Sequence, residues 1–385
     1  MILFKGCRVY APEFIGEKDV LVAGGKIVAL AAEIQSQAGY DIEILDAGSL
    51  RMLPGLIDSH VHIAGAGGEG GPATRTPEMS LRDMLEGGIT TVIGCLGTDG
   101  LTRSVASVLM KAKGLRQEGV SAWIYTGAYQ VPPPTILGDV GKDIAMIEEI
   151  IGLGEIAIAD HRSSNPTLDE LIRLAKLARV GGMIGAKAGI VNIHLGDAPE
   201  PFAMLYAAIE KSELQFSQFL PTHCNRNRVV FEAAKIYGKK GYIDLTASSY
   251  PYYSDEEIKV SRCLKELLNA GVPLEHITFS SDGCGSRPTF DKEGNLLKLV
   301  SGKPKAIFKE LIDAVRQEKL PLEKALPAVT ANVARILKLN SKGRIGIGMD
   351  ADLLLLDEKD QITHLLANGR WLIRNNEIIH PDSFV

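Results

Sequence analysis

The sequence predicts an α/β protein: a (β/α)8 barrel of the TIM type with a small β-sandwich domain built from both chain ends. Between residues 54 and 338, eight apolar runs of strand length alternate with longer segments of helical periodicity. The chain ends have a different pattern, in which apolar and polar residues alternate. An open doubly wound sheet usually has about five or six strands and a glycine-rich first turn, so a closed barrel accounts better for eight strand-helix units.

The alternating segments at the two ends indicate β-hairpins. Residues 18–31 alternate around a Gly24-Gly25 turn. Near the C-terminus the same pattern returns, with turns at Asn368-Gly369 and Asn375-Asn376. We therefore expect the two ends to pair into one small β domain.

The barrel is expected over residues 54–338, between the two parts of the small domain at 1–53 and 339–385. Its predicted strands are, in chain order, 56–63, 91–97, 121–127, 155–160, 190–195, 219–224, 242–248 and 277–283. Each run is followed by a segment that can form a helix. In the first of these, TPEMSLRDMLEGG, Thr76 is the predicted N-cap, Pro77 suits the first helical position, and Gly87 ends the helix.

Composition limits the class of protein. The 385 residues, 45% hydrophobic and 23% charged, can bury a large core. The net charge of -5, with Lys and Arg dispersed, argues against nucleic-acid and membrane-surface partners and favours a small, peptide-like one. No apolar run reaches the roughly 18 residues of a membrane span, and MILFKGC is too short for a secretory signal, so we expect a cytoplasmic protein. The five scattered cysteines lack a C-x-x-C pair, which predicts buried thiols rather than disulfides or a thiolate zinc site.

Histidines and an aspartate gather at the C-terminal ends of the predicted strands, the rim where barrel enzymes have their active sites. Because side chains alternate along a strand, His60 and His62 point to the same side. His194, His223 and Asp282 come from the fifth, sixth and eighth strands, so a barrel would bring all five groups above its axis. Each histidine alone could be an ordinary half-buried residue. Together the groups suit zinc or a similar divalent ion.

Longer motifs resemble a known group of enzymes. The motif PGLIDSHVH, the later single histidines, the aspartate of SSDG and the C-terminal GMDADLLLLD resemble the amidohydrolase superfamily, metal-dependent hydrolases with a (β/α)8 barrel and a flanking β domain. Within it, GAGGEGGPATRTPE, GCLGTDG, TGAYQVP, DHRSS, PTHCNRN and SSDGCGS are similar to the isoaspartyl dipeptidase family. The resemblance covers essentially the whole chain. It implies zinc-dependent hydrolysis of β-aspartyl (isoaspartyl) dipeptides.

The resemblance also implies two zinc ions per subunit. His60 and His62 would bind one ion, His194 and His223 the second, and Asp282 would ligate the first. Members of the family generally bridge the two ions with a carboxylated lysine in the fourth strand.

This chain has Glu155 at the matching position, which departs from the family pattern. Alternation places Glu155 on the same face as Ala157 and Ala159, where a carboxylate needs a cation to offset its burial. We therefore expect Glu155 to bridge the two ions. The alternative is that Glu155 caps the strand at the opposite rim and one ion is bound weakly. Lys187 is a poor substitute because it precedes the fifth strand.

The resemblance implies the catalytic groups as well. A hydroxide that bridges the metal ions would attack the amide carbonyl, with Asp282 as general base and then general acid. Tyr129 would stabilise the developing oxyanion. The sequence has no G-x-S-x-G elbow, which agrees with a mechanism that uses no protein nucleophile.

An isoaspartyl dipeptide carries one ammonium group and two carboxylates. The predicted substrate-binding residues are Gly67, Glu69, Thr98, Arg162, Arg226 and Ser286. Glu69 is expected to pair with the ammonium group, and Gly67 to let the backbone approach the substrate. Arg162 and Arg226 are expected to grip the carboxylates through bidentate hydrogen bonds, aided by Thr98 and Ser286.

Three other functions stay open from the sequence. Another amidohydrolase, acting on N-acyl amino acids or cyclic amides, would not need both Arg162 and Arg226. A non-catalytic scaffold of the same fold is disfavoured by the intact set of metal ligands. A phosphate-handling barrel is disfavoured because no glycine-rich loop leads into a helix after strand seven or eight. The resemblance further suggests a large homo-oligomer such as an octamer.

Overall fold

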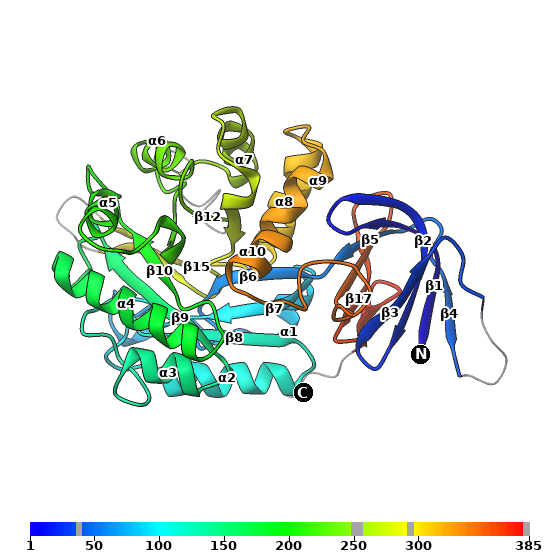
Figure 1. Cartoon of the computed structure of the whole chain (residues 1–385), viewed down its shortest axis with the longest axis horizontal. Coiled ribbons are helices and arrows are strands. Elements are labelled where there is room, and N and C mark those ends of the chain that lie inside the picture. The colour runs from blue at the N-terminus through cyan, green and yellow to red at the C-terminus, as the bar shows by residue number, and fades with distance from the viewer. Residues whose placement is uncertain (36–40, 248–256, 291–295, 380–385) are drawn as a thin grey trace.

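The structure is a computed structural model that describes residues 1–35, 41–247, 257–290 and 296–379. It consists of a barrel and a smaller β domain that lie side by side along the longest axis (Figure 1). The N-terminal strands and the last strands of the chain both belong to the smaller domain, as the alternating patterns predicted. None of the helices in the described part of the chain has the length and apolar character that crossing a bilayer requires.

Eight parallel strands form the wall of the barrel. They are β6 (Leu56–Val61), β7 (Ile89–Gly94), β8 (Ser121–Thr126), β9 (Ile150–Ile158), β10 (Ile190–Leu195), β11 (Phe219–Thr222), β12 (Ile243–Thr246) and β13 (Ile277–Ser280). Each corresponds to one predicted strand. The fourth begins at Ile150 rather than Glu155, and Ser248, the last residue of the predicted seventh strand, lies outside the described residues.

Backbone hydrogen bonds close this wall. Strands β6 to β11 pair in chain order as one parallel sheet, and β12 pairs with β13. The two parts join where Cys224 N donates to Asp244 O at 3.1 Å. At the other seam, His62 N donates to Gly283 O at 2.9 Å and Asp282 N donates to His60 O at 3.0 Å. The backbone hydrogen bonds that close the barrel therefore involve the predicted metal ligands His60, His62 and Asp282.

Helices cover the outside of the barrel (Figure 1). They are α1 (Leu81–Leu85), α2 (Val105–Gln117), α3 (Val140–Met146), α4 (Leu168–Ile184), α5 (Ala203–Glu210), α6 (Arg228–Tyr237), α7 (Val260–Asn269), α8 (Ala306–Arg316), α9 (Leu322–Ala325) and α10 (Ala331–Ile336). Short 3-10 turns are η1 (Pro72–Thr74), η2 (Phe216–Gln218), η3 (Leu274–His276) and η4 (Leu326–Val329). Helix α4 shows the common pattern: Leu171, Leu174, Ala175 and Ala178 bury one face, as helical periodicity requires.

The predicted start of α1 is wrong. Ser80, not Thr76, is the N-cap, and it forms a capping box with Asp83. The Thr76 hydroxyl instead accepts from Ala66 N and donates to Cys284 O, both at 2.6 Å. Thr76 thus joins the loop after β6 to the loop after β13, a tertiary role that a local capping pattern does not reveal.

The small domain is one continuous mixed sheet that wraps around its own core. Its strands are β1 (Ile2–Tyr10), β2 (Phe14–Ala23), β3 (Lys26–Ala31), β4 (Glu43–Asp46), β5 (Arg51–Pro54), β16 (Leu353–Leu356), β17 (Ile362–Ala367), β18 (Arg370–Arg374) and β19 (Glu377–Ile378). Strand β5 from the N-terminal part pairs with β16 from the C-terminal part. The predicted turns at Gly24-Gly25, Asn368-Gly369 and Asn375-Asn376 all have positive φ, and each connects two adjacent antiparallel strands.

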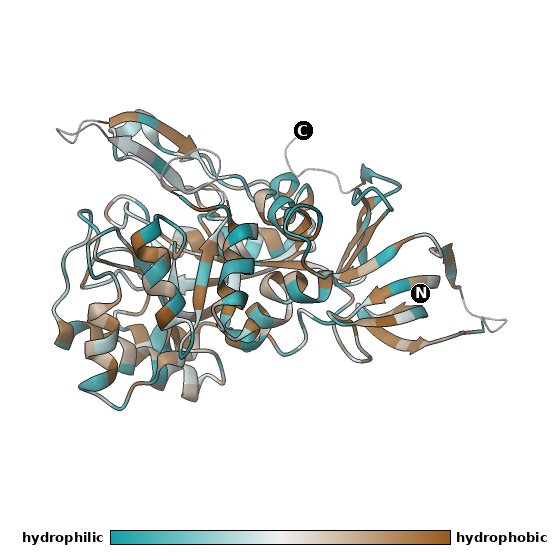
Figure 2. Cartoon of the chain, turned by 90° about the horizontal axis from the view of Figure 1, so that it is seen from above, coloured by the Kyte–Doolittle hydropathy of each residue, from teal (hydrophilic) through white to brown (hydrophobic). Residues whose placement is uncertain are grey.

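A hairpin of β14 (Ser286–Phe290) and β15 (Leu296–Ser301) follows the last barrel strand and was not predicted. In the view from above it projects from the barrel (Figure 2). A Cβ on Gly70 would lie only 2.2 Å from Leu296 Cδ2, so the first residue of β15, which pairs with Phe290, packs directly on the glycine-rich loop after β6.

The buried carboxylate of Asp244 in β12 holds neighbouring strands together. Its Oδ2 accepts from Thr222 Oγ1 of β11 at 2.7 Å and from Ser280 Oγ of β13. Its Oδ1 accepts from Thr278 Oγ1 at 2.6 Å. Burial raises the pKa of Asp244. Since Thr222 and Ser280 stand one and two residues before predicted metal ligands, this network fixes the position of the strand ends that carry them.

We predict that Asp244→Ala lowers the free energy of unfolding by about 3 kcal/mol, because it leaves several buried hydroxyl groups without their acceptor. Urea unfolding followed by circular dichroism measures the effect. The control is Asp169→Ala, a change of an exposed carboxylate in α4 that should stay within about 0.5 kcal/mol of the unchanged protein. Equal stability of the two variants would contradict the structural role of Asp244.

Candidate metal centre

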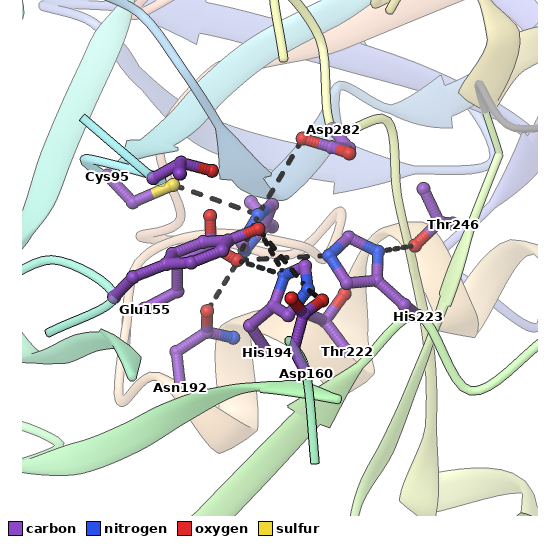
Figure 3. A network of polar contacts seen from close by, with 12 residues as sticks. Cys95, Glu155, Asp160, Asn192, His194, Thr222, His223, Thr246 and Asp282 are labelled. Carbon is purple, nitrogen blue, oxygen red and sulfur yellow. Dashed lines mark hydrogen bonds and ion pairs between the residues drawn. The ribbon is translucent and has the colours of Figure 1, made fainter. Parts of the chain in front are cut away.

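Four histidines converge at the C-terminal end of the barrel. His60 and His194 lie near the ends of β6 and β10, while His62 and His223 follow β6 and β11. All four are buried, and their rings meet edge-on, with the centroids of His60 5.5 Å from His62 and 5.6 Å from His223, and those of His194 and His223 4.5 Å apart. Figure 3 shows His194 and His223 side by side. The structure therefore brings together the imidazoles that the sequence predicted as metal ligands.

The Glu155 carboxylate of β9 stands at the centre of this group (Figure 3). Its Oε2 lies 3.3 Å from His60 Nε2, 3.1 Å from His194 Nδ1 and 3.8 Å from His223 Nε2. Its Oε1 lies 3.4 Å from His62 Nε2. Burial alone would raise the pKa of Glu155, but the surrounding histidines hold it well below its usual range. This placement contradicts the alternative in which Glu155 caps the opposite rim.

Lys187 has no part in the cluster. Its Nζ donates to the carbonyl oxygens of Ile144 and Ile147, and the former bond is 2.7 Å long. These carbonyls belong to the end of α3, so Lys187 lies where the sequence placed it, before the fifth strand.

Asp282 reaches the cluster from the loop after β13. Its Oδ1 lies 3.0 Å from His62 Nε2 and 3.8 Å from His60 Nε2, while its Oδ2 accepts from Arg287 at 3.1 Å. Burial opposes ionisation, yet Arg287 and the neighbouring imidazoles lower the pKa of Asp282. Sequence reasoning missed Arg287, which comes from the unpredicted hairpin. The backbone of Asp282 and that of His223 are left-handed, with φ of 48° and 64°, and such conformations concentrate at functional sites.

The donor set fits divalent cations. Glu155 Oε1 and Asp282 Oδ1 are buried without a hydrogen-bond partner, although buried carboxylate oxygens normally have one. Outer contacts orient two imidazoles: Asn192 Oδ1 lies 2.9 Å from His60 Nδ1, and Thr246 Oγ1 lies 2.7 Å from His223 Nδ1. Both rings consequently turn Nε2 towards the centre, as ligating histidines do.

Two overlapping groups of ligand atoms are close enough to share an ion. One comprises Glu155, His194 and His223, and the other comprises His60, His62, Cys95 and Glu155. Glu155 belongs to both, which is the arrangement that a bridging ligand needs. Cys95 was predicted only as a buried thiol, and all five cysteines are buried and free.

A second carboxylate, Asp160, was missed by sequence reasoning. Its Oδ2 lies 2.9 Å from His194 Nε2, and Arg162 donates two hydrogen bonds to its carboxylate, at 3.0 and 2.9 Å. Arg226 lies 3.6 Å from the same oxygen. Burial opposes ionisation, yet His194 and Arg162 lower the pKa of Asp160. Because Asp160 contacts Nε2 of His194, the other ring nitrogen, Nδ1, points towards Glu155. Asp160 also contacts both predicted substrate-binding arginines, Arg162 and Arg226.

Glu69 lies next to this group. Its Oε1 accepts from Ser286 Oγ at 2.6 Å and from Thr98 Oγ1 at 3.2 Å, and Arg162 NH1 is 3.6 Å away. Thr98 and Ser286 were expected to aid the arginines, whereas here they donate to Glu69. The other oxygen, Oε2, is buried without a partner. Glu69 thus has one oxygen that is held in place and one that is available to a ligand.

Tyr129 lies over His194, with its hydroxyl 2.7 Å from His194 Nδ1. Burial raises the pKa of Tyr129 well above its usual value, so the phenol keeps its proton and can donate it in a hydrogen bond. The Arg162 guanidinium stands 5.5 Å from the centre of its ring. The structure thus places Tyr129 beside the predicted metal ligands.

Gly67 has a structural reason to be glycine. Its φ is +80°, and a Cβ would lie 2.5 Å from Thr74 O and 3.0 Å from Thr76 N. The residue forms an isolated bridge with Arg75, so the glycine-rich loop folds back on itself at this point. Its contact with a substrate stays a prediction.

Comparisons with known proteins agree with this geometry. A model of the amidohydrolase family matches residues 51–372. The β-aspartyl dipeptidase of Fervidobacterium islandicum AW-1, solved with β-Asp-Leu dipeptide, has a TM-score of 0.93 and 42% identity, with 99% of both chains covered. Dihydropyrimidinase from Brevibacillus agri NCHU1002 shares the fold, with a TM-score of 0.70 and 18% identity over 98% of this chain and 96% of that one. An allantoinase of Deinococcus radiodurans is 24% identical over 96% of this chain and 89% of that protein.

We predict that a chelator lowers the melting temperature and that added zinc restores it, because two buried carboxylates lose their cations when the metal is removed. Zinc at about 100 times its dissociation constant should stabilise the chain by about 2.7 kcal/mol. Differential scanning calorimetry measures the shift. Glu155→Gln should reduce the zinc-dependent shift in melting temperature. Glu310→Gln, which changes a buried carboxylate of α8, should leave that shift unchanged. A melting temperature that does not respond to zinc would contradict the metal centre.

Proposed function

The chain belongs to the amidohydrolase family, and from this premise we propose that it is a zinc-dependent dipeptidase that cleaves β-aspartyl dipeptides. One observation carries the proposal: charged groups that match a β-aspartyl dipeptide surround the metal cluster. Glu69 offers a free buried oxygen, Arg162 lies 3.6 Å from its other oxygen, and Arg226 lies 3.6 Å from Asp160. The dipeptidase of Fervidobacterium islandicum AW-1, solved with β-Asp-Leu, supports the same substrate class.

Substrate binding uses protein groups of both charges. The α-ammonium group pairs with Glu69 Oε2, since Oε1 is already occupied by Ser286 and Thr98. The carboxylates pair with Arg162 and Arg226, whose planar guanidinium groups suit bidentate binding. Asp160 holds both guanidinium groups in position before a ligand arrives. A substrate without these charges would leave the buried groups unpaired, which provides specificity.

The residues that would hold two metal ions are His60, His62, His194, His223, Glu155 and Asp282. Bound divalent ions supply Lewis acidity, which polarises a carbonyl group and lowers the pKa of water. Zinc as the metal, and two ions per chain, are part of the proposal.

Two protein groups complete the chemistry. Asp282 accepts the proton of the attacking water and delivers it to the nitrogen of the departing amine, as a base that becomes an acid. Arg287 keeps Asp282 ionised and correctly oriented for the first of these transfers. The Tyr129 hydroxyl, which stays protonated, donates to the carbonyl oxygen as negative charge develops on it.

We predict that the protein hydrolyses β-Asp-Leu at least about 100 times faster than α-Asp-Leu in terms of kcat/KM, since misplacing the reacting amide by about one ångström costs that factor. Release of free leucine, followed by chromatography with the zinc-loaded enzyme, measures both rates. Turnover of α-Asp-Leu at the same rate would contradict the proposal. Turnover of allantoin or dihydroorotate in place of both dipeptides would assign the chain to cyclic amides.

We predict that Glu69→Gln lowers kcat/KM for β-Asp-Leu about 10- to 100-fold, because it removes a charge-assisted contact worth about 1.5–3 kcal/mol. Succinyl-leucine, which lacks the α-ammonium group, provides the matched substrate. The unchanged enzyme should prefer β-Asp-Leu over succinyl-leucine by a similar factor, and Glu69→Gln should lose that preference.

Glu78→Gln is the control for this experiment, because Glu78 is an exposed acid outside the cluster. It should behave as the unchanged enzyme. If Glu69→Gln weakens the turnover of both substrates equally, Glu69 has only a structural role and the ammonium group binds elsewhere.

A further inference from the structure

We propose that Cys95 is a further ligand of the metal centre, a thiolate bound to the ion that His60 and His62 hold. This role rests on the metal dependence of the family and not on which amide the enzyme cleaves. It adds sulfur to a set of ligands that otherwise consists of imidazoles and carboxylates.

Cys95 is held at the inner rim of the barrel. It directly follows β7, is fully buried, and donates its backbone N–H to Val61 O at 3.0 Å. Its Sγ lies 3.8 Å from His60 Nε2 and 3.8 Å from His62 Nδ1 (Figure 3). Nitrogen and sulfur ligands of one tetrahedral zinc ion are about 3.5 Å apart, given bonds of about 2.0 and 2.3 Å. The 3.8 Å between Cys95 Sγ and His60 Nε2 exceeds that separation by only a few tenths of an ångström, so a small shift suffices for Cys95 to ligate.

An unpartnered carboxylate oxygen points into the same space. Glu155 Oε1 is buried, has no hydrogen-bond partner, and belongs with His60, His62 and Cys95 to one group of potential ligand atoms that lie within 4.8 Å of one another. Buried carboxylate oxygens without a partner are rare in folded proteins. The space beside Cys95 is therefore built to receive a cation, and the thiol is part of its lining.

Charge balance also favours a thiolate. Two divalent ions bring four positive charges into a buried site, whereas Glu155 and Asp282 bring two negative ones. Asp282 in addition forms an ion pair with Arg287 at 3.1 Å, so part of its charge is already compensated. An ionised Cys95 reduces the remaining excess of positive charge, which is costly in a dry interior.

Within the described part of the chain, no other cysteine belongs to a group of potential metal ligands. Cys263, for example, is buried in α7, where its Sγ donates to Ile258 O at 3.7 Å. Cys95 Sγ also lies 3.6 Å from Val61 O, a long contact that ligation would replace. On binding, the sulfur–metal bond forms as the S–H bond breaks, and the proton leaves to solvent. No oxidant or reductant is required. A soft thiolate favours zinc and cobalt over magnesium and manganese.

The test replaces the native metal of the full chain with Co²⁺ and records the near-ultraviolet spectrum, where a cobalt–thiolate bond gives a charge-transfer band. We expect the band in the unchanged protein and in the control Cys263→Ser, and its loss in Cys95→Ser at equal cobalt content by elemental analysis. Absence of the band from the unchanged protein, or its persistence in Cys95→Ser, would overturn the assignment. Cys95 would then be a buried thiol that contacts His60 and His62 without binding the metal.

A second measurement needs no variant. Cys95 of the unchanged protein should react with a thiol reagent at least about ten times more slowly when zinc is bound than after chelation, because a metal-bound thiolate is not free to attack. Peptide mass spectrometry identifies the modified residue, and Cys263 should show no dependence on zinc. Equal reactivity of Cys95 in both states argues against ligation. Hydrolysis of β-Asp-Leu is scored separately, so a cobalt–thiolate band without turnover would support Cys95 while refuting the proposed substrate.

Discussion

The site depends on one buried carboxylate surrounded by four imidazoles. Glu155 is 1% exposed and lies within 4 Å of nitrogen atoms from His60, His62, His194 and His223. An ionised carboxylate in this environment is stable only with positive charge next to it. Such a requirement is met either by protonated imidazoles or by metal ions. Since the family is metal-dependent and the outer contacts of His60 and His223 turn Nε2 inwards, metal ions meet it here.

The hydrogen bonds that close the barrel also position residues of the candidate metal centre. The last seam is made by backbone hydrogen bonds between the residues around His60 and those around Asp282. A change that opened this seam would separate His60 from Asp282, two of the proposed metal ligands. Asp244 stabilises the strands next to this seam, because its carboxylate joins β12 to β11 and β13. Metal binding and barrel stability should therefore be coupled, since an ion that bridges strand ends binds only the closed form.

The sequence predicted elements whose signal is local, and missed those whose partners come from elsewhere in the fold. Eight buried strands were found because each is a continuous apolar run, although the glycines at 152 and 154 obscured the start of β9. The histidines were found because their spacing repeats one pattern at several strand ends. Asp160 and Cys95 are single residues at strand ends; Arg162 stands only two residues after Asp160, but the histidines that Asp160 and Cys95 contact come from other strands. Asp160 could have been noticed by the same rule that found Asp282, namely a carboxylate at the C-terminal rim.

Loops that are distant in the chain are joined at a few points around the candidate site. Thr76 connects the glycine-rich loop to Cys284 O, and Leu296 of β15 packs on Gly70. The same two loops supply Glu69 and Ser286, which share a hydrogen bond of 2.6 Å. The hairpin thus contributes Ser286, which donates to Glu69, and Arg287, which donates to Asp282. If Glu69 binds the ammonium group and Asp282 transfers the proton, as proposed, this hairpin supports both groups, and it would help a widely shared fold to select one class of dipeptide.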